Sequence, residues 1–186
     1  MLEQKTVYIV AGANGSGKTT FAINFSNIKN IEFINADEIA KEYDPNDIQK
    51  YKVKAGRIFF KRLKKSLNEE NSFVIETTLS GKYLTKIIPV AQSNGFKVVL
   101  LYLFLENSFE NVNRVKNRVL AGGHNVPYKD IIRRYTRSKI LFWNQYKNLV
   151  DEWFMFYNGD DKFEIVASNG DIIDEELFDK FKKDLE

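Results

Sequence analysis

The feature that most restricts the fold of this chain is a glycine-rich segment, Gly12-Ala13-Asn14-Gly15-Ser16-Gly17-Lys18-Thr19. It matches the pattern Gly-x-x-x-x-Gly-Lys-Ser/Thr without deviation. An apolar run typical of a strand, Thr6–Ala11, precedes it, and a helical pattern begins at Thr19. A strand, a glycine-rich turn and a helix in this order predict a phosphate-binding loop, which we call the P-loop (residues 12–19).

The residue types of the P-loop indicate what it binds. Glycines let successive backbone N–H groups face one anion, and the following helix adds the positive end of its dipole. Lys18 can reach the β- and γ-phosphates, and the Thr19 hydroxyl is a ligand for Mg²⁺. We therefore expect ATP and Mg²⁺ as the bound species, held by residues 12–19 and Thr20.

Other motifs narrow the class of P-loop protein. A GTPase normally carries an Asn-Lys-x-Asp motif, and the sequence has none. A mechanical ATPase normally ends an apolar strand with paired acids, whereas the strand Phe73-Val74-Ile75 is followed by the single acid Glu76. These absences favour an ATP-dependent phosphotransferase, a kinase.

Apolar runs alternate with longer amphipathic segments along the chain, which predicts strands alternating with helices. We expect strands at 6–11, 31–34, 72–75, 96–105, 153–157 and 163–167, and helices at 19–26, 38–42, 47–70, 83–93, 108–120, 128–150 and 174–185. Several strands are apolar throughout, as is typical of strands covered on both faces. The prediction is a three-layer α/β fold, with a parallel sheet between helices, in one domain spanning residues 1–186.

The composition sets limits on the site and on the compartment. The chain has no cysteine, which excludes disulfides and thiolate metal sites. Its longest apolar run, Val98–Leu105, is too short to cross a bilayer. The polar segment Met1–Thr6 is not followed by a signal-peptide pattern. We expect a cytoplasmic protein without a membrane partner.

Two more strand ends carry polar side chains. Asn35 and Asp37 follow the second expected strand, and Glu76 follows the third. The carboxyl ends of parallel strands meet at one edge of a sheet, so these residues are expected beside the P-loop. Asp37 could accept the proton of an attacking hydroxyl. The alternative is that Asp37 caps a short helix from Glu38, a contact that Asn35 could also supply.

The remaining polar groups at this edge concern the acceptor and the metal. Glu76 could orient Mg²⁺ through water or hold the acceptor. Thr77 and Thr78 offer hydroxyls to the acceptor, although ordinary hydrogen bonding at the strand end is the alternative and is favoured for Thr78. The expected acceptor-binding residues are Asn35, Asp37, Glu76 and Thr77.

Basic charge is concentrated in one segment. Residues 114–139 carry eight Lys/Arg and the single acid Asp130, a net charge of +7, whereas residues 151–186 carry −8. A nucleic-acid binder usually spreads basic charge over a broad face. Charge gathered beside a glycine-rich break suits a compact polyphosphate better, so we expect no nucleic-acid partner.

The same segment has the pattern of a lid. One expected helix ends at Gly122-Gly123, and the next begins after Pro127. Arg118 and Arg134 flank this hinge and would meet the charge on a transferred phosphoryl group. His124, the only histidine, is expected to be part of the hinge. A solvated basic surface is the alternative interpretation of the segment, and it fits three lysines best: Lys116, Lys129 and Lys139.

Residues 6–158 resemble the zeta-toxin family of P-loop kinases in its short form. The resemblance rests on the P-loop and on motifs at the two strand ends and in the lid. These are Asn35-x-Asp37, Glu76-Thr77-Thr78, Arg118-Val119-x-x-Gly122-Gly123-His124-x-Val126-Pro127, Ile131-x-x-Arg134 and Arg137-Ser138.

The resemblance implies ATP-dependent phosphorylation of a small-molecule hydroxyl, with UDP-N-acetylglucosamine as the family's best-known acceptor. It implies a kinase-type sheet of strand order 2-3-1-4-5, a helical lid and a small antitoxin protein as a candidate partner. It assigns catalysis to Lys18, Asp37, Arg118 and Arg134, and acceptor contacts to the region of Glu76. The chain is more compact than the larger toxins, so the acceptor stays open.

Two other functions remain as alternatives. The lid arginines would also suit a kinase acting on a nucleoside, a nucleotide or a nucleic-acid end. A non-catalytic ATP-binding regulatory module is the other alternative, and intact Lys18 and Asp37 argue against it.

Overall fold

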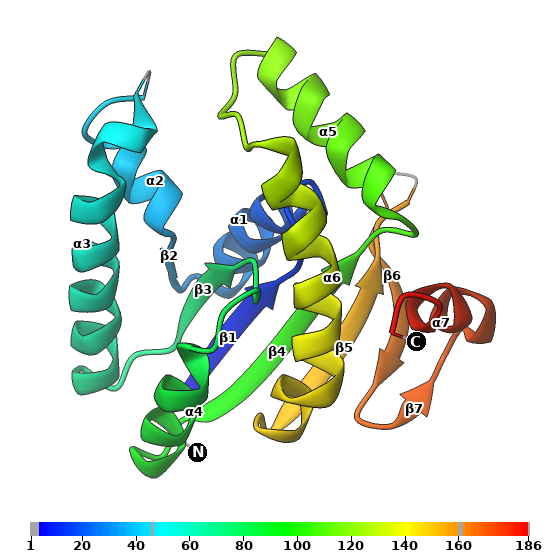
Figure 1. Cartoon of the computed structure of the whole chain (residues 1–186). Coiled ribbons are helices and arrows are strands. Elements are labelled where there is room, and N and C mark those ends of the chain that lie inside the picture. The colour runs from blue at the N-terminus through cyan, green and yellow to red at the C-terminus, as the bar shows by residue number, and fades with distance from the viewer. Residues whose placement is uncertain (1–3, 46, 160–161, 186) are drawn as a thin grey trace.

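The computed structural model describes residues 4–45, 47–159 and 162–185. The strands are β1 (Thr6–Ala11), β2 (Glu32–Ile34), β3 (Phe73–Thr77), β4 (Lys97–Phe104), β5 (Glu152–Tyr157), β6 (Glu164–Ser168) and β7 (Asp171–Ile172). The helices are α1 (Lys18–Lys29), α2 (Ala36–Lys41), α3 (Ile48–Asn68), α4 (Leu84–Ser93), α5 (Ser108–Leu120), α6 (Tyr128–Asn144), the 3-10 helix η1 (Tyr146–Asn148) and α7 (Glu175–Lys182). Strands and helices alternate up to β5, as predicted (Figure 1).

The seven strands of the described residues form one sheet in the order β2-β3-β1-β4-β5-β6-β7. The first five in this order are parallel, which confirms the predicted order 2-3-1-4-5. Strands β6 and β7 instead pair antiparallel. The chain between Tyr157 and Glu164 is too short for a crossover helix, so β6 must return as a hairpin beside β5.

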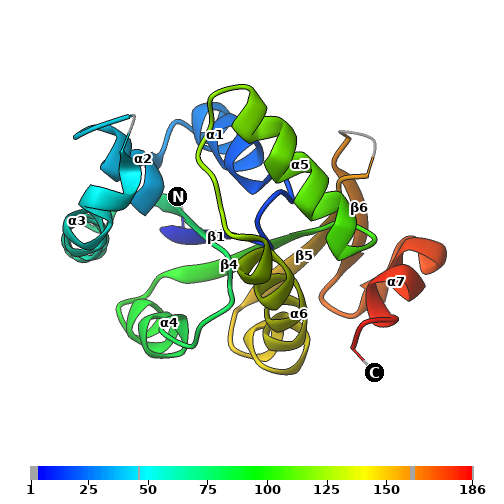
Figure 2. The same ribbon diagram turned by 45° about the horizontal axis from the view of Figure 1, so that its top comes forward.

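Side chains alternate between the two faces of the sheet. In β4, Leu100 and Tyr102 belong to one apolar cluster, and Leu101 and Leu103 belong to another. Helices α4 and α6 cover the first face and α1 covers the second (Figures 1 and 2). The three-layer α/β fold is therefore confirmed, and both faces of the central strands are dry.

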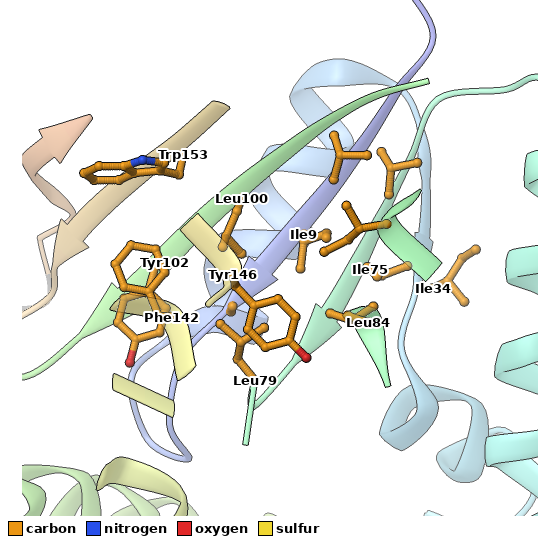
Figure 3. Packing of buried hydrophobic residues seen from close by; sticks show 14 of the residues in the cluster. Ile9, Ile34, Ile75, Leu79, Leu84, Leu100, Tyr102, Phe142, Tyr146 and Trp153 are labelled. Carbon is orange, nitrogen blue, oxygen red and sulfur yellow. The ribbon is translucent and has the colours of Figure 1, made fainter. Parts of the chain in front are cut away.

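The larger cluster fixes α6 to the sheet. The rings of Tyr102 and Phe142 are stacked with centroids 4.2 Å apart (Figure 3). The Tyr102 hydroxyl hydrogen-bonds Ser138 Oγ at 3.1 Å. Helix α6 is thus packed directly on β4, which positions the site residues near its start relative to the sheet.

Several helix boundaries differ from the prediction by a few residues, and two of these differences have a clear local cause. Helix α2 begins at Ala36 rather than Glu38, because the Asn35 side chain caps it. Helix α6 ends at Asn144 rather than Val150, because the backbone of Gln145 leaves the helical region. Tyr146 is then fully buried, and its hydroxyl donates to Gly81 O at 2.6 Å. In the part of the chain that the structure describes, no helix is long and apolar enough to cross a bilayer.

Candidate active site

The P-loop joins β1 to α1 and depends on its glycines. Gly12, Gly15 and Gly17 have φ values of 147°, 84° and 85°, a region that favours glycine. A Cβ at Gly12 would strike the backbone oxygen of Leu103, and one at Gly17 would strike the side chain of Asn158. The loop is therefore wrapped closely by the ends of its neighbouring strands.

Two asparagines that the sequence analysis missed brace the P-loop. Asn111 in α5 donates to Asn14 O at 2.6 Å, and Asn158 after β5 donates to Ser16 O at 3.1 Å. Both side chains are buried. The position of Asn158 just after an apolar strand, at the same sheet edge as the P-loop, was a usable signal. Asn111 lies within a helix and gave none.

Lys18, Thr19 and Glu76 form the charged centre of the site. Lys18 Nζ donates to Ala13 O at 3.1 Å and lies 3.7 Å from Glu76 Oε1. The Thr19 hydroxyl donates to the same carboxylate oxygen at 3.1 Å. The structure thus brings together the P-loop lysine, the predicted metal ligand and the acid at the end of β3.

The electrostatics of this centre follow from burial. Burial lowers the pKa of Lys18, against the attraction of Glu76 and Asp37. Burial also raises the pKa of the Glu76 carboxyl, against Lys18 and the hydrogen bonds from Thr19 and Asn35. A bound phosphate would relieve the lysine, and a bound cation would relieve the carboxylate.

Asn35 links the ends of β2 and β3. Its side-chain oxygen accepts from the backbone N–H groups of Asp37, at 2.6 Å, and of Glu38, at 3.2 Å. Its amide nitrogen donates to Glu76 Oε2. Asn35 is therefore the cap of α2, and the interpretation of Asp37 as the cap is wrong. The reason is geometric, because Asp37 already lies in the first helical turn.

Asp37 instead lines a cavity beside Lys18. This cavity has a volume of about 770 Å³, and its wall includes Lys18, Thr19, Asp37, Arg118, Asn158 and Phe163. Within the described ranges the Asp37 carboxylate makes no hydrogen bond to a side chain. A carboxylate that faces a cavity without a partner has its lone pairs available for a proton.

Thr77 and Thr78 bond locally at the end of β3. Thr77 Oγ1 accepts from the backbone N–H of Leu79 at 3.0 Å, and Thr78 Oγ1 lies 2.9 Å from Ser80 Oγ. Leu79 has a φ of 52°, so these contacts support a tight turn. Neither threonine is part of the cavity wall that the described residues form.

The first part of the lid ends where predicted. Helix α5 stops before Gly122, which has a φ of 83°, and Gly123 N donates to Arg118 O at 2.8 Å. The Arg118 guanidinium donates to His124 O at 2.7 Å. His124 Nε2 also lies 3.1 Å from Gln49 Nε2 in α3. His124, which the sequence places in the expected hinge, thus links the end of α5 to α3.

The second helix of the expected lid, α6, contacts the P-loop. Arg134 Nη1 in α6 donates to Asn14 Oδ1 at 3.1 Å. Both Arg134 and Arg118 act to lower the pKa of Lys18, which places the two guanidiniums in its electric field. Arg114, which the sequence analysis did not single out, donates to the backbone oxygens of Asn158 and Gly159.

Lys139 does not belong to a solvated basic surface. Only 1% of its side chain is exposed, and its Nζ lies 2.7 Å from Asp184 Oδ2. The Tyr135 hydroxyl donates to the same carboxylate at 2.6 Å. The alternative interpretation for Lys139 is therefore wrong, because Asp184, in the segment after α7, supplies its counter-ion.

The residues present fit a nucleotide with a cation. A Cβ on Gly12, Gly15 or Gly17 would collide with neighbouring atoms, so only glycine fits at these positions of the P-loop. Lys18 lines the cavity next to the loop. Within the described residues no group of three or more His, Cys, Asp or Glu could hold a metal. The donors are one hydroxyl, Thr19, and one carboxylate, Glu76, an arrangement typical of Mg²⁺ that is bound together with phosphates.

Comparison with known proteins gives matches at the level of both sequence and fold. The AAA domain family matches residues 7–135. An uncharacterized protein of Haemophilus influenzae is 30% identical over 134 residues, which cover 72% of this chain and 93% of that protein.

Two solved structures share the fold. The AvrRxo1-ORF1:AvrRxo1-ORF2 complex with sulphate ions has a TM-score of 0.78 at 16% identity, over 97% of this chain. This chain spans only 64% of the AvrRxo1 chain that it matches. The PezAT chromosomal toxin–antitoxin system of Streptococcus pneumoniae has a TM-score of 0.67 at 15% identity, over 97% of this chain and 78% of that one. At these identities the likeness concerns the fold alone.

Proposed function

The chain belongs to the AAA domain family, and from that premise we propose that it is a kinase that transfers the γ-phosphoryl group of ATP to a hydroxyl group. The observation that carries the proposal is the convergence of three kinds of group on one cavity. These are the P-loop with Lys18, the carboxylate of Asp37 and the lid guanidinium of Arg118. Phosphoryl transfer requires these three kinds of group, since its catalysis depends on positioning the reactants and stabilising their charge.

The nucleotide would lie along the P-loop. Residues Gly12 to Thr20 would hold the phosphates through backbone N–H groups, with Lys18 on the β- and γ-phosphates. Thr19 and Glu76 would hold Mg²⁺, the latter directly or through water. When bound, this ion supplies charge neutralisation to the phosphate oxygens. The AvrRxo1-ORF1:ORF2 complex, which is similar in fold, has been crystallised with ATP.

The acceptor would approach from the side of α2. Its hydroxyl oxygen forms a bond to the γ-phosphorus while the bond from that phosphorus to the β–γ bridging oxygen breaks. The hydroxyl proton passes to the Asp37 carboxylate, and the electron pair of the broken bond stays on ADP. Arg118 and Arg134 would stabilise the charge on the transferred group.

The acceptor class follows from the zeta-toxin resemblance. We propose a small molecule with a free hydroxyl, of which UDP-N-acetylglucosamine or a related nucleotide-sugar is the first candidate. The fold likeness to the PezAT toxin–antitoxin system makes a small antitoxin a candidate partner. Asn35 and Glu76 would shape the acceptor side through their mutual hydrogen bond.

Mass spectrometry can test the proposal directly. Purified protein is incubated with ATP, Mg²⁺ and a metabolite extract, and in parallel with UDP-N-acetylglucosamine alone. The expected result is a product heavier by one phosphoryl group, formed much more slowly when Asp37→Asn protein replaces the wild type. ATP binding without any phosphorylated product in either mixture would contradict a kinase and favour a regulatory ATP-binding module.

A further inference from the structure

Helix α3 carries more basic charge than the lid. Its 21 residues include eight Lys/Arg and no acidic residue. The helix lies at the outer edge of the molecule, beyond β2 (Figures 1 and 2). Arg62 pairs with Glu42 and Lys65 pairs with Glu69. The other six have no ion-pair partner among the described residues, so α3 presents a field of uncompensated positive charge.

Exposed apolar side chains lie within this charge. The side of α3 that packs on the core is occupied by residues such as Phe59 and Leu63. On the outer side, Val53 is 72% exposed and Phe60 is 47% exposed. The two are seven residues apart, so they lie two turns apart on one face. Arg57, between them in the sequence, is exposed on the same side.

The face extends onto the start of α4. The ring of Phe60 meets that of Tyr83 edge-on, with centroids 5.9 Å apart. Tyr83 is itself 37% exposed. Lys61 and Lys64 border the same stripe on α3 and are exposed. The result is a rigid ridge with two apolar positions in its centre and cations on both sides.

We propose that this outer face of α3, defined by Val53, Arg57, Phe60, Lys61 and Lys64, is a docking surface for an acidic amphipathic helix of a second protein. Charge complementarity selects an acidic partner and steers its approach. The spacing of Val53 and Phe60 matches a partner helix with apolar residues at intervals of two turns. The proposal does not rest on phosphoryl transfer, since it concerns a surface outside the cavity.

The composition of the face favours protein over nucleic acid. Phosphates would use the lysines and arginines but would leave Val53 and Phe60 in water. Nucleobases need free aromatic faces. The nearby rings of Tyr43 and Tyr51 are stacked on each other, with their centroids 5.5 Å apart. The Lys54 ammonium lies 4.0 Å from the centroid of the Tyr43 ring. These rings are already occupied by protein groups.

A partner on this face would lie next to the cavity of the site. The first turn of α3 provides Gln49, which contacts the hinge residue His124, and Lys52 lines the hinge-side cavity of about 590 Å³. Helix α2, which carries Asp37, packs against α3. A helix bound along α3 would therefore touch the element that supports the acceptor side.

Fluorescence anisotropy with a defined probe tests the proposal. The probe is a labelled synthetic peptide with the length of α3, with leucines at every seventh position and glutamates on both sides. A second peptide has the same composition but scattered leucines, and a third probe is a single-stranded RNA of similar charge. We expect saturable binding of the first peptide to the intact protein, weakened by added salt.

Two variants separate the contributions of charge and apolar contact. Arg57→Glu/Lys61→Glu/Lys64→Glu and Val53→Ser/Phe60→Ser should each weaken binding of the first peptide at least about tenfold. The matched control Lys29→Glu/Lys116→Glu/Lys129→Glu changes the net charge equally and should leave binding within about twofold. ATP-dependent thermal protection reports whether each variant is folded.

Several results would overturn the proposal. Equal binding of the scattered peptide, or equal loss in the control variant, would mean non-specific attraction to the basic protein. Tighter binding of the RNA, unaffected by Val53→Ser/Phe60→Ser, would assign the face to nucleic acid. Concentration-dependent self-association that disappears with either α3 variant would assign it to a second copy of this chain.

Discussion

Lys18 Nζ lies 3.7 Å from Glu76 Oε1, and both side chains are more than nine-tenths buried. The P-loop lysine is therefore paired with the acid at the end of β3. The Thr19 hydroxyl donates to the same oxygen. A bound triphosphate would pair with Lys18, and a bound cation would pair with Glu76. Neither buried charge would then be left without a partner.

Lys18→Ala should abolish phosphoryl transfer and strongly weaken ATP binding. The P-loop contains no second lysine that could take the place of Lys18. The measurement is the ATP-dependent rise in melting temperature, which should largely vanish in the variant. Lys29→Ala, at the far end of the same helix, is the control and should keep full protection. Unchanged protection in Lys18→Ala would contradict the assignment of the P-loop.

Asp37→Asn should keep ATP binding while the rate of transfer falls by about 10²-fold or more, because general-base assistance is lost. The fold should be unaffected, since Asn35 and not Asp37 caps α2. Steady-state kinetics with the identified acceptor measure the rate, and Glu38→Gln is the neighbouring control. A near-normal rate in Asp37→Asn would leave the proton acceptor to another group.

Asn35→Ala should behave differently from Asp37→Asn. The variant loses the cap of α2, which should lower the free energy of unfolding by about 1 kcal/mol. It also removes the amide that holds Glu76 Oε2. Chemical denaturation measures the first effect, and the Mg²⁺ concentration needed for half-maximal activity measures the second. Unchanged stability would show that another group satisfies the N–H groups of Asp37 and Glu38.

Asp184→Asn tests the buried pair behind the lid. Burial raises the pKa of Asp184, but hydrogen bonds from Lys139 and Tyr135 outweigh it and hold the pKa below its usual 3.8. The ionised Asp184 carboxylate therefore stabilises the folded state at pH values above 3.8. This stabilisation is lost as the pH falls through the lowered pKa. Near pH 7 the variant should lose about 1–3 kcal/mol, because the carboxylate is partly exposed while Lys139 is buried.

The difference between wild type and Asp184→Asn should shrink in acid, as measured by denaturation at pH 7 and below pH 3.8. The double variant Lys139→Met/Asp184→Asn should recover most of the loss, since a buried apolar chain needs no counter-ion. A pH-independent difference would mean that the effect comes from packing alone.

Much of the site could be predicted because local sequence determines it. The glycines of the P-loop determine its backbone conformation within a few residues. Asp37 and Glu76 come after apolar stretches of parallel strands whose ends share one sheet edge. Asn111 escaped prediction because its contact with Asn14 spans 97 residues and leaves no local pattern. Lys139 was misread because its counter-ion lies 45 residues away on the segment after α7.

The topology, too, could be predicted in part and was missed in part. Apolar runs predicted the parallel strands, and the resemblance supplied their order. The antiparallel pairing of β6 depends on the short connection after Tyr157, which apolarity does not report. Strand β7 has two exposed residues, Asp171 and Ile172, and gave no periodic signal. The charge on α3 was visible in the sequence, but its isolation from acidic partners needed the fold.

Arg118 and Arg134 should matter more to the chemical step than to the affinity for ATP. The P-loop N–H groups, Lys18 and Mg²⁺ already neutralise much of a bound triphosphate. Charge on the transferred group is redistributed only as its bond breaks, and the lid arginines would meet it then. In the structure Arg134 donates to Asn14 and Arg118 to the His124 backbone, so each guanidinium would exchange this partner for the transferred group.

Arg118→Ala and Arg134→Ala should therefore lower kcat by on the order of 10²-fold or more, with little change in nucleotide affinity. Arg→Lys should rescue poorly, because one ammonium cannot reproduce the planar fork. Asn14→Ala separates the contact seen in the structure from the expected role of Arg134: it removes the contact but keeps the guanidinium, so kcat should fall far less. Lys116→Ala and Lys129→Ala are the surface controls and should stay near wild type. Pre-steady-state kinetics distinguish the chemical step from product release. Similar small losses in all the arginine and lysine variants would mean that the basic segment steers substrates and takes no part in the transfer.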